Sequence, residues 1–572
     1  MKCILSFIKP LRSKIVLGLS IRAVSTLVEL FIPFILAYIL ENVIAKNNVG
    51  EIIGFGVIMV LCALVACMGG ITSNRIAASV TRQFSYEMRR ELFAKTLLLS
   101  ARSTDKFTIP SLESRITSDT YHVQNFVSMI QKMGIRAPLL LMGGTAITLF
   151  MDSALALVMI ATLPIIFVVV YGISRRGVPL YTGVQKKVDN MVRVVREDAQ
   201  GIRVIKALSK SDYENRRYDK VNKALIREET HAGTIMGIVN PAMTMIMNLG
   251  IAAVVAVAAF RINNNLSSPS TVIAFMQYFT IISTSMMSIS RMFVMYTKCA
   301  ASANRIAEII ECKNELALIA DDGKGNCDYH ISFENVCFSY LGKKNNLQNI
   351  NVKLRAGQHL GIIGATGSGK STFVKLLLRF YDADSGIIRI NGRDIRSYSK
   401  SELTSMFGAV LQNGFLYADT IEENIRFGRD IPTEDIIDAA KIAQAHSFIE
   451  GFSEGYSHML TSKGTNLSGG QRQRVLIARA LAAKPDILIL DDSSSALDYK
   501  TDSLLRAALA EKMTGSTVIT VAQRVSSVKN CDIILVFEEG NIIGCGTHEE
   551  LLNTCTEYRE ISDSQMGGAF VE

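Results

Sequence analysis

The sequence predicts a multidomain protein in which an all-α transmembrane domain of six helices precedes an α/β domain of the P-loop type. Apolar residues make up 49% of the 572 residues, and the long uncharged apolar tracts all fall within residues 1–300. Residues 331–572 have the mixed composition of an α/β domain and contain a glycine-rich loop between a predicted strand and a predicted helix. Residues 301–330 are the expected linker.

The first half contains the candidate membrane spans. Crossing the hydrocarbon core of a bilayer takes about 20 mostly apolar residues. The tracts that meet this requirement lie at about 15–40, 51–71, 134–151, 153–173, 235–261 and 270–297. Because their number is even, both chain ends are predicted to lie on the same side of the membrane.

The distribution of Lys and Arg predicts the orientation in the membrane. The links at 45–50 and 263–269 and the turn near Asp152 carry one Lys between them, whereas segments 75–106 and 174–228 are rich in Lys and Arg. By the positive-inside rule, these long segments, both termini and the second half are cytoplasmic. The net charge of +9 therefore indicates a multi-pass protein of the cell (plasma) membrane rather than a nucleic-acid-binding protein.

The cysteines and the N-terminus agree with this placement. The ten cysteines include no CxxC pair and no metal-like spacing with histidine, which favours a reduced cytosolic setting over a disulfide framework. The first apolar tract starts near Lys14 and lacks a small-residue cleavage pattern, so we expect no cleavable signal peptide.

The two long cytoplasmic segments are predicted to be helices that extend beyond the bilayer. Residues 72–100 contain no Pro or Gly, and residues 185–228 are typical of a helix with a break at Gly201. The breaks near 103–112 and 208–214 would then lie at the far tips of these helices. We expect the tips to dock on the C-terminal domain, and ordinary helix–helix turns are the alternative.

Several polar side chains fall in or near the spans. Arg22 and Glu29 are seven residues apart, which places them on one helix face where a structural pairing is possible. Polar groups inside a membrane are costly and often functional, so contact with a transported molecule also stays open. The other residues of this kind are Asn248, Gln277 and Arg291.

The most specific motif is the glycine-rich stretch that follows the predicted strand 358–363 and opens a predicted apolar-faced helix. This strand–loop–helix context is what a phosphate-binding loop requires. Its glycines let backbone N–H groups turn toward phosphate oxygens, Lys370 can reach the β- and γ-phosphates, and the Ser371 hydroxyl can hold Mg²⁺. The second half is therefore predicted to be an α/β P-loop nucleotide-binding domain. The proposed phosphate-binding residues are Gly364, Thr366, Gly367, Ser368, Gly369, Lys370, Ser371 and Thr372.

A second motif completes the expected metal site. Residues 487–490 are all apolar and Asp491 follows them, the pattern of a parallel-sheet strand that is buried on both faces and ends in a carboxylate. Ligands of such sheets bind beyond the carboxyl ends of the strands. Asp491 is therefore predicted to lie beside Ser371 and to hold Mg²⁺ directly or through water.

A third motif precedes a helix that is predicted to begin near Gln473. A Ser-Gly-Gly turn at the start of a helix is a second cradle for an anion. Because one compact domain needs only one triphosphate site, we expect this cradle to cap a nucleotide held by another copy or by a partner. The motif consists of Leu467, Ser468, Gly469, Gly470 and Gln471.

Over nearly its whole length the chain resembles the ATP-binding cassette (ABC) transporters, specifically half-transporters of the bacterial exporter type. The resemblance implies that Tyr340 stacks on adenine, that Gln412 senses Mg²⁺ and the γ-phosphate, and that Asp491 is the Walker B aspartate. It also implies that the tips at 103–118 and 208–216 are coupling helices, one of which grips the cassette of a partner. The residues that match the D-loop are Ser495, Ala496, Leu497 and Asp498.

Two residues depart from the family pattern. The family has Glu after the Walker B aspartate, where it orients the attacking water, and this chain has Asp492, which withdraws the carboxylate by roughly 1.5 Å. The histidine of the family's switch is replaced by Gln523, which can donate a hydrogen bond to a γ-phosphate but cannot carry a positive charge. Both departures affect the same chemical step, so this site is predicted to bind Mg-ATP well and to hydrolyse it poorly.

These features predict one subunit of an ATP-hydrolysing translocase, a heterodimeric exporter. Residues 467–471 match the signature motif of the resembled family, and this intact motif would complete the hydrolytic site of a second half-transporter. A slow homodimer is the alternative. The expected cargo is a small amphipathic molecule (drug, lipid or peptide), and the membrane lipid is the other expected contact. A siderophore-type importer of the same fold and a regulatory ATP-binding subunit with little hydrolysis are the alternative functions.

Overall fold

The computed structural model describes residues 2–566 except 47, 265, 314–315, 322, 324–327, 341 and 343. The chain divides into two compact units. The helical unit comprises Met1–Leu98 and Ile109–Cys312, and the α/β unit comprises Leu99–Thr108 and Lys313–Glu572. A short segment from the middle of the helical half thus belongs to the α/β unit.

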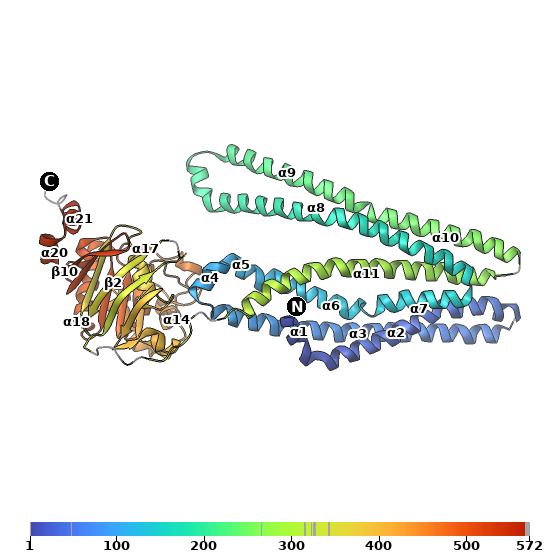
Figure 1. Ribbon diagram of the computed structural model, residues 1–572, viewed down its shortest axis with the longest axis horizontal. Helices are drawn as coiled ribbons and strands as arrows, with labels where there is room; N and C mark the ends of the chain where they lie inside the picture. The colour runs from blue at the N-terminus through green and yellow to red at the C-terminus, as the bar shows by residue number, and fades with distance from the viewer. Residues whose placement is uncertain are drawn as a thin grey trace. The chain divides into compact units, whose positions relative to one another are not determined.

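The helical unit consists of long helical stretches (Figure 1). Within the described residues, six of them are long and apolar enough to cross a membrane, which confirms the predicted all-α organisation of this half. Large apolar side chains such as Val57, Leu61 and Leu64 remain exposed on α3, as expected of a surface that faces lipid. The stretches are Ile4–Val43, Val49–Leu97, Ile109–Met151, Ser153–Ala207, Ser211–Asn263 and Pro269–Ile310.

Local capping explains where several of these helices begin. The side chains of Asn48, Asp152 and Ser268 accept hydrogen bonds from backbone N–H groups in the first turns of α3, α8 and α11. Asp152 also forms an ion pair with Arg261 at 3.0 Å. This ion pair joins the start of the stretch Ser153–Ala207 to the end of the stretch Ser211–Asn263. The helices of this unit include α1 Lys2–Ile8, α2 Arg12–Tyr38, α3 Val49–Leu97, α5 Ile109–Ser114, α6 Thr120–Met133, α7 Arg136–Met151, α8 Ser153–Ala207, α9 Ser211–Gly237, α10 Val239–Asn263 and α11 Pro269–Ile310.

The helix break predicted at Gly201 is wrong. Helix α8 continues through Gly201 to Ala207, and the chain turns at residues 208–210, where Ser209 has φ 51°. A single glycine in a helix costs about 1 kcal/mol relative to alanine. Helix α8 packs along α9, and that packing outweighs so small a local preference.

The polar residues near the spans do not form the expected pair of Arg22 with Glu29. Glu29 accepts a hydrogen bond from Arg136 of α7 at 2.8 Å, so its ion-pair partner is Arg136 rather than Arg22. Among the described residues, the Arg22 Nε atom is buried without a hydrogen-bond partner. Asn248, Gln277 and Arg291 are exposed.

The α/β unit contains two sheets (Figure 1). One has the strand order β10-β9-β3-β8-β7-β6 and is parallel except for the β9–β10 hairpin. The other, β2-β1-β4-β5, is antiparallel. The strands are β1 Ile331–Phe338, β2 Leu347–Leu354, β3 His359–Gly364, β4 Ser385–Ile390, β5 Arg393–Asp394, β6 Phe407–Val410, β7 Ile487–Asp491, β8 Thr517–Val521, β9 Ile533–Glu538 and β10 Asn541–Gly546.

Three hydrophobic cores among the described residues hold this unit together, and the third includes Ile363, Val536 and Tyr558. The first joins both sheets to the P-loop helix α12 (Lys370–Leu377), where Phe333 and Phe373 stack with ring centroids 4.1 Å apart. The second surrounds α17 (Gly469–Leu481). Other helices are α13 Lys400–Ser405, α14 Ile421–Arg426, α15 Thr433–Ile442, α16 His446–Glu450, α18 Tyr499–Lys512, α19 Val525–Val528, α20 His548–Thr554 and α21 Thr556–Met566. The predicted fold class, six apolar helices followed by an α/β domain, is confirmed.

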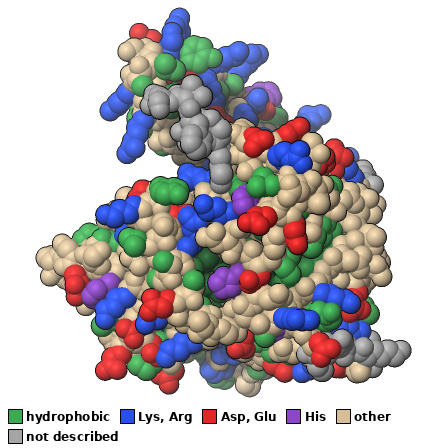
Figure 2. All heavy atoms as spheres, turned by 90° about the vertical axis from the view of Figure 1, so that its left-hand side faces the viewer, with side chains coloured by type: hydrophobic (Ala, Val, Ile, Leu, Met, Phe, Trp, Pro, Cys, Tyr) green, Lys and Arg blue, Asp and Glu red, His purple; other side chains and the backbone are tan. Residues whose placement is uncertain are grey.

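The surface of the α/β unit carries charges of both signs. Figure 2 shows Lys and Arg side chains interspersed with Asp and Glu side chains on the face that it presents. Such mixing is typical of a protein surface that stays soluble in water.

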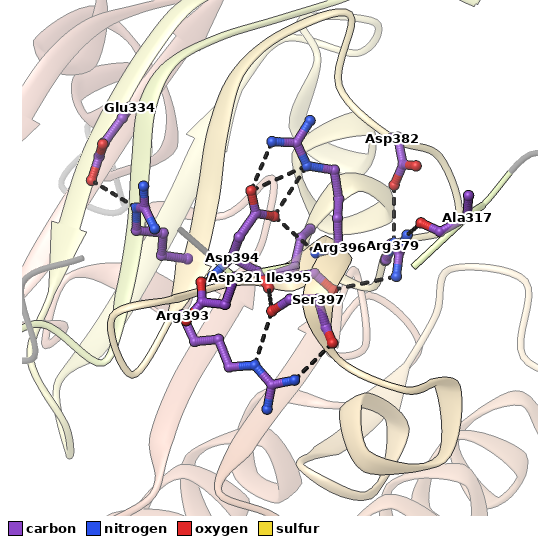
Figure 3. Close-up of polar contacts among 11 residues, drawn as sticks. Ala317, Asp321, Glu334, Arg379, Asp382, Arg393, Asp394, Ile395, Arg396 and Ser397 are labelled. Carbon is purple, nitrogen blue, oxygen red and sulfur yellow. Dashed lines mark hydrogen bonds and ion pairs between the residues drawn. The ribbon is translucent and has the colours of Figure 1, made fainter. Parts of the chain in front are cut away.

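Helix α11 takes up residues 301–310 of the expected linker, and the chain at residues 316–321 lies on the α/β unit (Figure 3). Arg379 Nη2 donates to the Ala317 carbonyl at 2.8 Å, and the backbone N–H of Asp394 donates to Asp321 Oδ1 at 3.3 Å. The buried Arg379 also pairs with Asp382 at 3.0 Å. These contacts hold the chain that follows α11 against the segment that follows the P-loop helix.

Helix α4 (Ala101–Phe107) is the segment of the helical half that belongs to the α/β unit. Ala101 packs against the first core, and the hydroxyl of Tyr381 donates to Asp105 Oδ2 at 2.5 Å. The helix ends at Thr108, whose φ of 61° reverses the chain. The docking expected of the first helix tip is therefore confirmed for α4.

Candidate nucleotide-binding site

The candidate site lies where the parallel strands end. Strand β8 lies between β3 and β7, and β6 lies beyond β7. Gly364 ends β3 and Asp491 ends β7, while Gln412 and Gln523 each follow within two residues of the ends of β6 and β8. Because these strands are parallel, their carboxyl ends meet at one edge of the sheet. The fold thus gathers at one edge the four motif positions that are separated in the sequence.

The P-loop has a backbone that only glycine can adopt at its two ends. Gly364 has φ 148°, and a Cβ atom there would lie 2.1 Å from the Phe537 carbonyl oxygen. Gly369 has φ 110° and precedes the first residue of α12. The Lys370 ammonium donates to the carbonyl oxygens of Gly364 and Ala365 at 2.8 and 2.7 Å. The lysine is thereby held over the loop rather than in solvent.

The groups around the loop suit a phosphate ligand. Ser368 is 4% exposed, and its hydroxyl has no hydrogen-bond partner among the described residues. At Gly367 a Cβ atom would meet no described atom within 4 Å, so the loop leaves open space there. Burial lowers the pKa of Lys370, and the neighbouring carboxylates of Asp491 and Asp492 oppose this shift. A buried hydroxyl, a buried lysine and a helix N-terminus are a donor set that fits phosphate oxygens.

Ser371 and Asp491 lie together, as the sequence predicted. The Ser371 hydroxyl donates to Asp491 Oδ1 at 3.3 Å. Asp491 is 4% exposed, and burial raises its pKa, while the Ser371 hydrogen bond and the charge of Lys370 lower it. A hydroxyl and a carboxylate oxygen are ligands that Mg²⁺ prefers, so the pair fits this ion.

The two residues that depart from the family pattern contact each other. Gln523 Nε2 donates to Asp492 Oδ2 at 3.4 Å. The backbone N–H of Asp492 donates to the Val521 carbonyl at 2.9 Å, and Asp492 has φ 51°, so its backbone is held to the end of β8. The amide–carboxylate contact lies at the two positions where the resemblance implies a glutamate and a histidine.

Helix α21 holds the segment that carries Gln523. The backbone N–H of Val525 donates to Gln565 Oε1 at 2.8 Å, and Gln565 Nε2 donates to the Gln523 carbonyl at 2.8 Å. One side-chain amide thus fixes two backbone groups of this segment. Sequence reasoning missed Gln565 because it belongs to no motif and lies 42 residues from Gln523.

Tyr340 lies beside the P-loop helix. Its hydroxyl donates to Thr372 Oγ1 at 3.3 Å, and the Lys375 ammonium lies 5.5 Å from the centre of its ring. The edge of Tyr381 meets the ring with centroids 5.2 Å apart. Gln412 is exposed beyond the end of β6. The structure therefore places Tyr340 next to the loop that would hold the phosphates.

The Ser-Gly-Gly motif starts a helix earlier than predicted. Helix α17 begins at Gly469 rather than near Gln473, because Ser468 and Gln471 form a capping box in which each side chain accepts a hydrogen bond from the other residue's backbone N–H. Leu467 packs on the second core, whereas α12 belongs to the first. Ser468 and Gly469 are exposed.

The predicted D-loop rests on this motif within the same chain. A Cβ atom at Gly470 would lie 3.1 Å from the Ala496 carbonyl oxygen, so a larger residue would require the backbone there to shift by a few tenths of an ångström. Leu497 is buried, Ser495 donates to the Asp492 carbonyl at 3.0 Å, and Asp498 caps α18. Hydrogen bonds from Thr501 lower the pKa of Asp498. The D-loop therefore connects Asp492 to the start of α17.

A P-loop with an acidic strand end, a capped Ser-Gly-Gly helix start and a six-helix apolar half define the class of ABC transporters that combine membrane and ATP-binding parts in one chain. Residues 15–286 match the family described as ABC transporter transmembrane region, and residues 347–495 match the family described as ABC transporter. The chain is 33% identical over 568 residues to the uncharacterized ABC transporter ATP-binding protein YfiB of Bacillus subtilis, covering 98% of each. The chain belongs to the ABC transporter family.

A second relative and a solved structure are consistent with this family and fold. The uncharacterized ABC transporter ATP-binding protein Rv1273c of Mycobacterium tuberculosis is 31% identical over 579 residues, with 99% of this chain and 98% of that protein covered. The fold is similar to the structure of a bacterial Atm1-family ABC exporter with ATP bound, with a TM-score of 0.84 and 22% identity over 98% of this chain and 100% of that one. The chain is thus a multi-pass membrane protein with the fold of an ABC half-transporter and an ATP-binding domain.

Proposed function

We propose that this chain is one subunit of a heterodimeric ABC exporter whose own nucleotide site binds Mg-ATP and hydrolyses it slowly. The observation that carries this proposal is the contact of Gln523 with Asp492 at 3.4 Å. Membership of the ABC transporter family supports ATP-driven transport, and half-transporters of this family act as dimers. In this assignment residues 1–300 are the membrane domain, 301–330 the linker and 331–572 the nucleotide-binding domain.

The proposed binding roles follow from the groups at the sheet edge. Lys370 and the loop backbone hold phosphates, Ser371 and Asp491 hold Mg²⁺ together with Gln412, and Tyr340 stacks on adenine. The bound Mg²⁺ would neutralise charge on the phosphate oxygens. Only slight movement of Lys370 is needed, because its ammonium already lies over the loop. These groups are complete, which supports tight binding of the nucleotide.

The proposed slow step is activation of water. A general base must lie within about 2.6–3.2 Å of the atom that donates the proton to it. The carboxylate of Asp492 is roughly 1.5 Å shorter in reach than that of a glutamate, and it accepts a hydrogen bond from Gln523. A displacement of about 1 Å can lower a rate on the order of 100-fold. An amide at position 523 also supplies neither a proton nor a positive charge.

The helix start at Ser468 would complete the nucleotide site of the proposed partner. The capping box leaves the Ser468 hydroxyl and the first N–H groups of α17 at an exposed helix N-terminus, which carries partial positive charge. Because the motif is intact, we infer that it faces ATP bound to a second half-transporter. That partner would supply the glutamate and histidine that this chain lacks.

The proposed setting is the plasma membrane, with both termini and the nucleotide-binding domain in the cytoplasm. The excess of Lys and Arg in segments 75–106 and 174–228 supports this orientation. The proposed cargo is a small amphipathic molecule that moves outward. A siderophore-type importer differs in direction, and transport measured in inside-out vesicles separates the two.

Two substitutions in the natural complex test the assignment of the two sites. Lys370→Ala removes the ammonium that holds phosphate at the slow site, so it is expected to weaken nucleotide binding there and to lower total ATP hydrolysis only partly. Ser468→Arg places a large cation in the cradle of the fast site, so hydrolysis is expected to fall about 100-fold, as for loss of transition-state positioning. ATPase activity of the complex purified through a tag on this chain measures both.

Thr465→Arg is the matched control for Ser468→Arg, because it adds the same charge at an exposed position three residues earlier. The control is expected to keep most of the activity. Unchanged hydrolysis in Ser468→Arg would contradict the pairing of this motif with a partner's nucleotide.

A further inference from the structure

Tyr381 connects two features that the sequence keeps far apart. Its hydroxyl donates to Asp105 of α4 at 2.5 Å, across 276 residues of sequence. Its ring meets the ring of Tyr340 edge-on, with centroids 5.2 Å apart and planes at 87°. Both contacts lie within the α/β unit, which includes α4. One buried side chain therefore contacts both the first cytoplasmic tip and the residue that would stack on adenine.

The Tyr381 hydroxyl is suited to act as a fixed donor. Tyr381 is 8% exposed, and burial together with the hydrogen bond to Asp105 raises its pKa far above the physiological range. The phenol therefore keeps its proton, and the carboxylate of Asp105 accepts a charge-assisted hydrogen bond. Such bonds are about twice as strong as neutral ones. A displacement of α4 would thus act directly on the position of Tyr381.

Tyr340 is held on several sides, and Tyr381 is one of them. The Phe338 ring also meets Tyr340 edge-on at 4.9 Å, and the Tyr340 hydroxyl donates to Thr372 at 3.3 Å. Edge-to-face pairs of this kind stabilise a ring orientation by about 0.5–1.5 kcal/mol beyond the burial of their area. Rotation or withdrawal of Tyr381 would therefore free the plane on which adenine stacks.

The same segment receives a second connection. Arg379, two residues before Tyr381, holds the Ala317 carbonyl of the linker at 2.8 Å. Arg379 has φ 51° and is buried, so its backbone is fixed where the P-loop helix ends. The short stretch 379–381 thus contacts both α4 and the chain that follows α11.

We propose that Tyr381 is a positioning residue that ties α4 to Tyr340, so that the position of the first cytoplasmic tip sets the affinity of this chain's own site for the adenine base of ATP. The proposal rests on the proposed function in one respect, that ATP binds at the P-loop with its base on Tyr340. It adds the route in this chain: Asp105, Tyr381, Tyr340 and Thr372.

A double-mutant cycle with a binding readout tests the route. Asp105→Leu removes the acceptor of the hydrogen bond and Tyr381→Phe removes its donor, and each keeps the approximate shape of the side chain. In the full-length complex, each is expected to weaken binding of an ATP analogue at this site about fivefold, the lower end of typical coupling between sites. The double variant is expected to be no weaker than either single variant, because both changes break the same contact.

Inorganic tripolyphosphate separates positioning from general damage. It binds a P-loop through phosphates and has no base, so its affinity is expected to be unchanged in all variants. Lys106→Ala, at an exposed neighbour of Asp105 on α4, is the matched control and is expected to bind ATP normally.

Equal weakening of ATP and tripolyphosphate, or additive effects of the two substitutions, would overturn the proposed route. Unchanged ATP affinity in every variant would overturn it as well, while leaving the proposed function standing. The proposed function itself would fail in a different way, through absence of ATP binding to the unaltered chain.

Discussion

At the scale of single residues, the proposed chemistry of this chain depends on the contact of Asp492 with Gln523 beside the proposed phosphate and metal site. The Lys370 side chain contacts the loop, and the Ser371 and Asp491 side chains contact each other, where we propose that Mg-ATP binds. Asp492 differs from a glutamate by one methylene, and Gln523 is directed at its carboxylate. In the proposed function, the site combines complete binding groups with an incomplete group for activating water.

Restoring both residues tests this reading at the same scale. Asp492→Glu with Gln523→His returns the reach of the base and the imidazole, so hydrolysis at this chain's site is expected to rise on the order of 100-fold. Release of phosphate from nucleotide crosslinked to this chain measures that site alone. Gln523→His without the second change is the control, and it is expected to give a much smaller gain.

No gain in the double variant would mean that these two positions do not limit the reaction. Equal gains in the single and double variants would place the whole defect on Gln523.

The residue contacts show what local sequence can and cannot predict. The juxtaposition of Ser371 with Asp491 was predictable, because each follows a buried parallel strand whose pattern is local. The hydrogen bond between Gln523 and Asp492 and the clamp by Gln565 were not, because they depend on which strands are neighbours and on where α21 packs. The sequence of α21 does not indicate that this helix contacts the segment 523–525.

At the scale of elements, the strands and the helix around the P-loop were predicted well, since apolar runs, glycines and a helix start all agree there. Helix α17 begins four residues before the predicted start, because the capping box of Ser468 and Gln471 starts the helix directly after Ser468. Helix α8 continues through Gly201, where a break was predicted. In both places tertiary packing or a cap outweighed a weak residue preference.

Helix α21 gives the prediction that belongs to this scale. Gln565→Ala removes two hydrogen bonds to the segment 523–525, and each typically contributes about 1 kcal/mol. Amide hydrogen exchange of this segment is therefore expected to become about fivefold faster for each bond that opens, since about 1.4 kcal/mol corresponds to a factor of ten. Mass spectrometry of peptides covering the segment measures the rate.

Gln565→Glu is a graded variant, because it keeps the acceptor for the Val525 N–H and loses the donor to the Gln523 carbonyl. It is expected to fall between the unaltered chain and Gln565→Ala. Asp563→Ala, at an exposed position of the same helix, is the control. Identical exchange in all of these proteins would show that α21 does not hold the segment.

At the scale of the whole molecule, the division into a helical half and an α/β half was predictable from composition alone. The membership of α4 in the α/β unit was expected only as docking of a tip, and its contact with Tyr381 could not be derived from local patterns. Contacts across hundreds of residues are set by packing of complete elements, and no periodicity encodes them. The proposed second half-transporter likewise rests on an exposed, intact Ser468 motif rather than on any contact within the chain.

The most direct measurement is ATP hydrolysis by this chain purified as the sole polypeptide in lipid nanodiscs, compared with the complex that copurifies from its native membrane. The account predicts that the chain alone binds ATP and Mg²⁺ but turns ATP over very slowly, and that the complex contains a second half-transporter and turns it over rapidly. Brisk hydrolysis by identical copies of this chain, with no other polypeptide present, would contradict it.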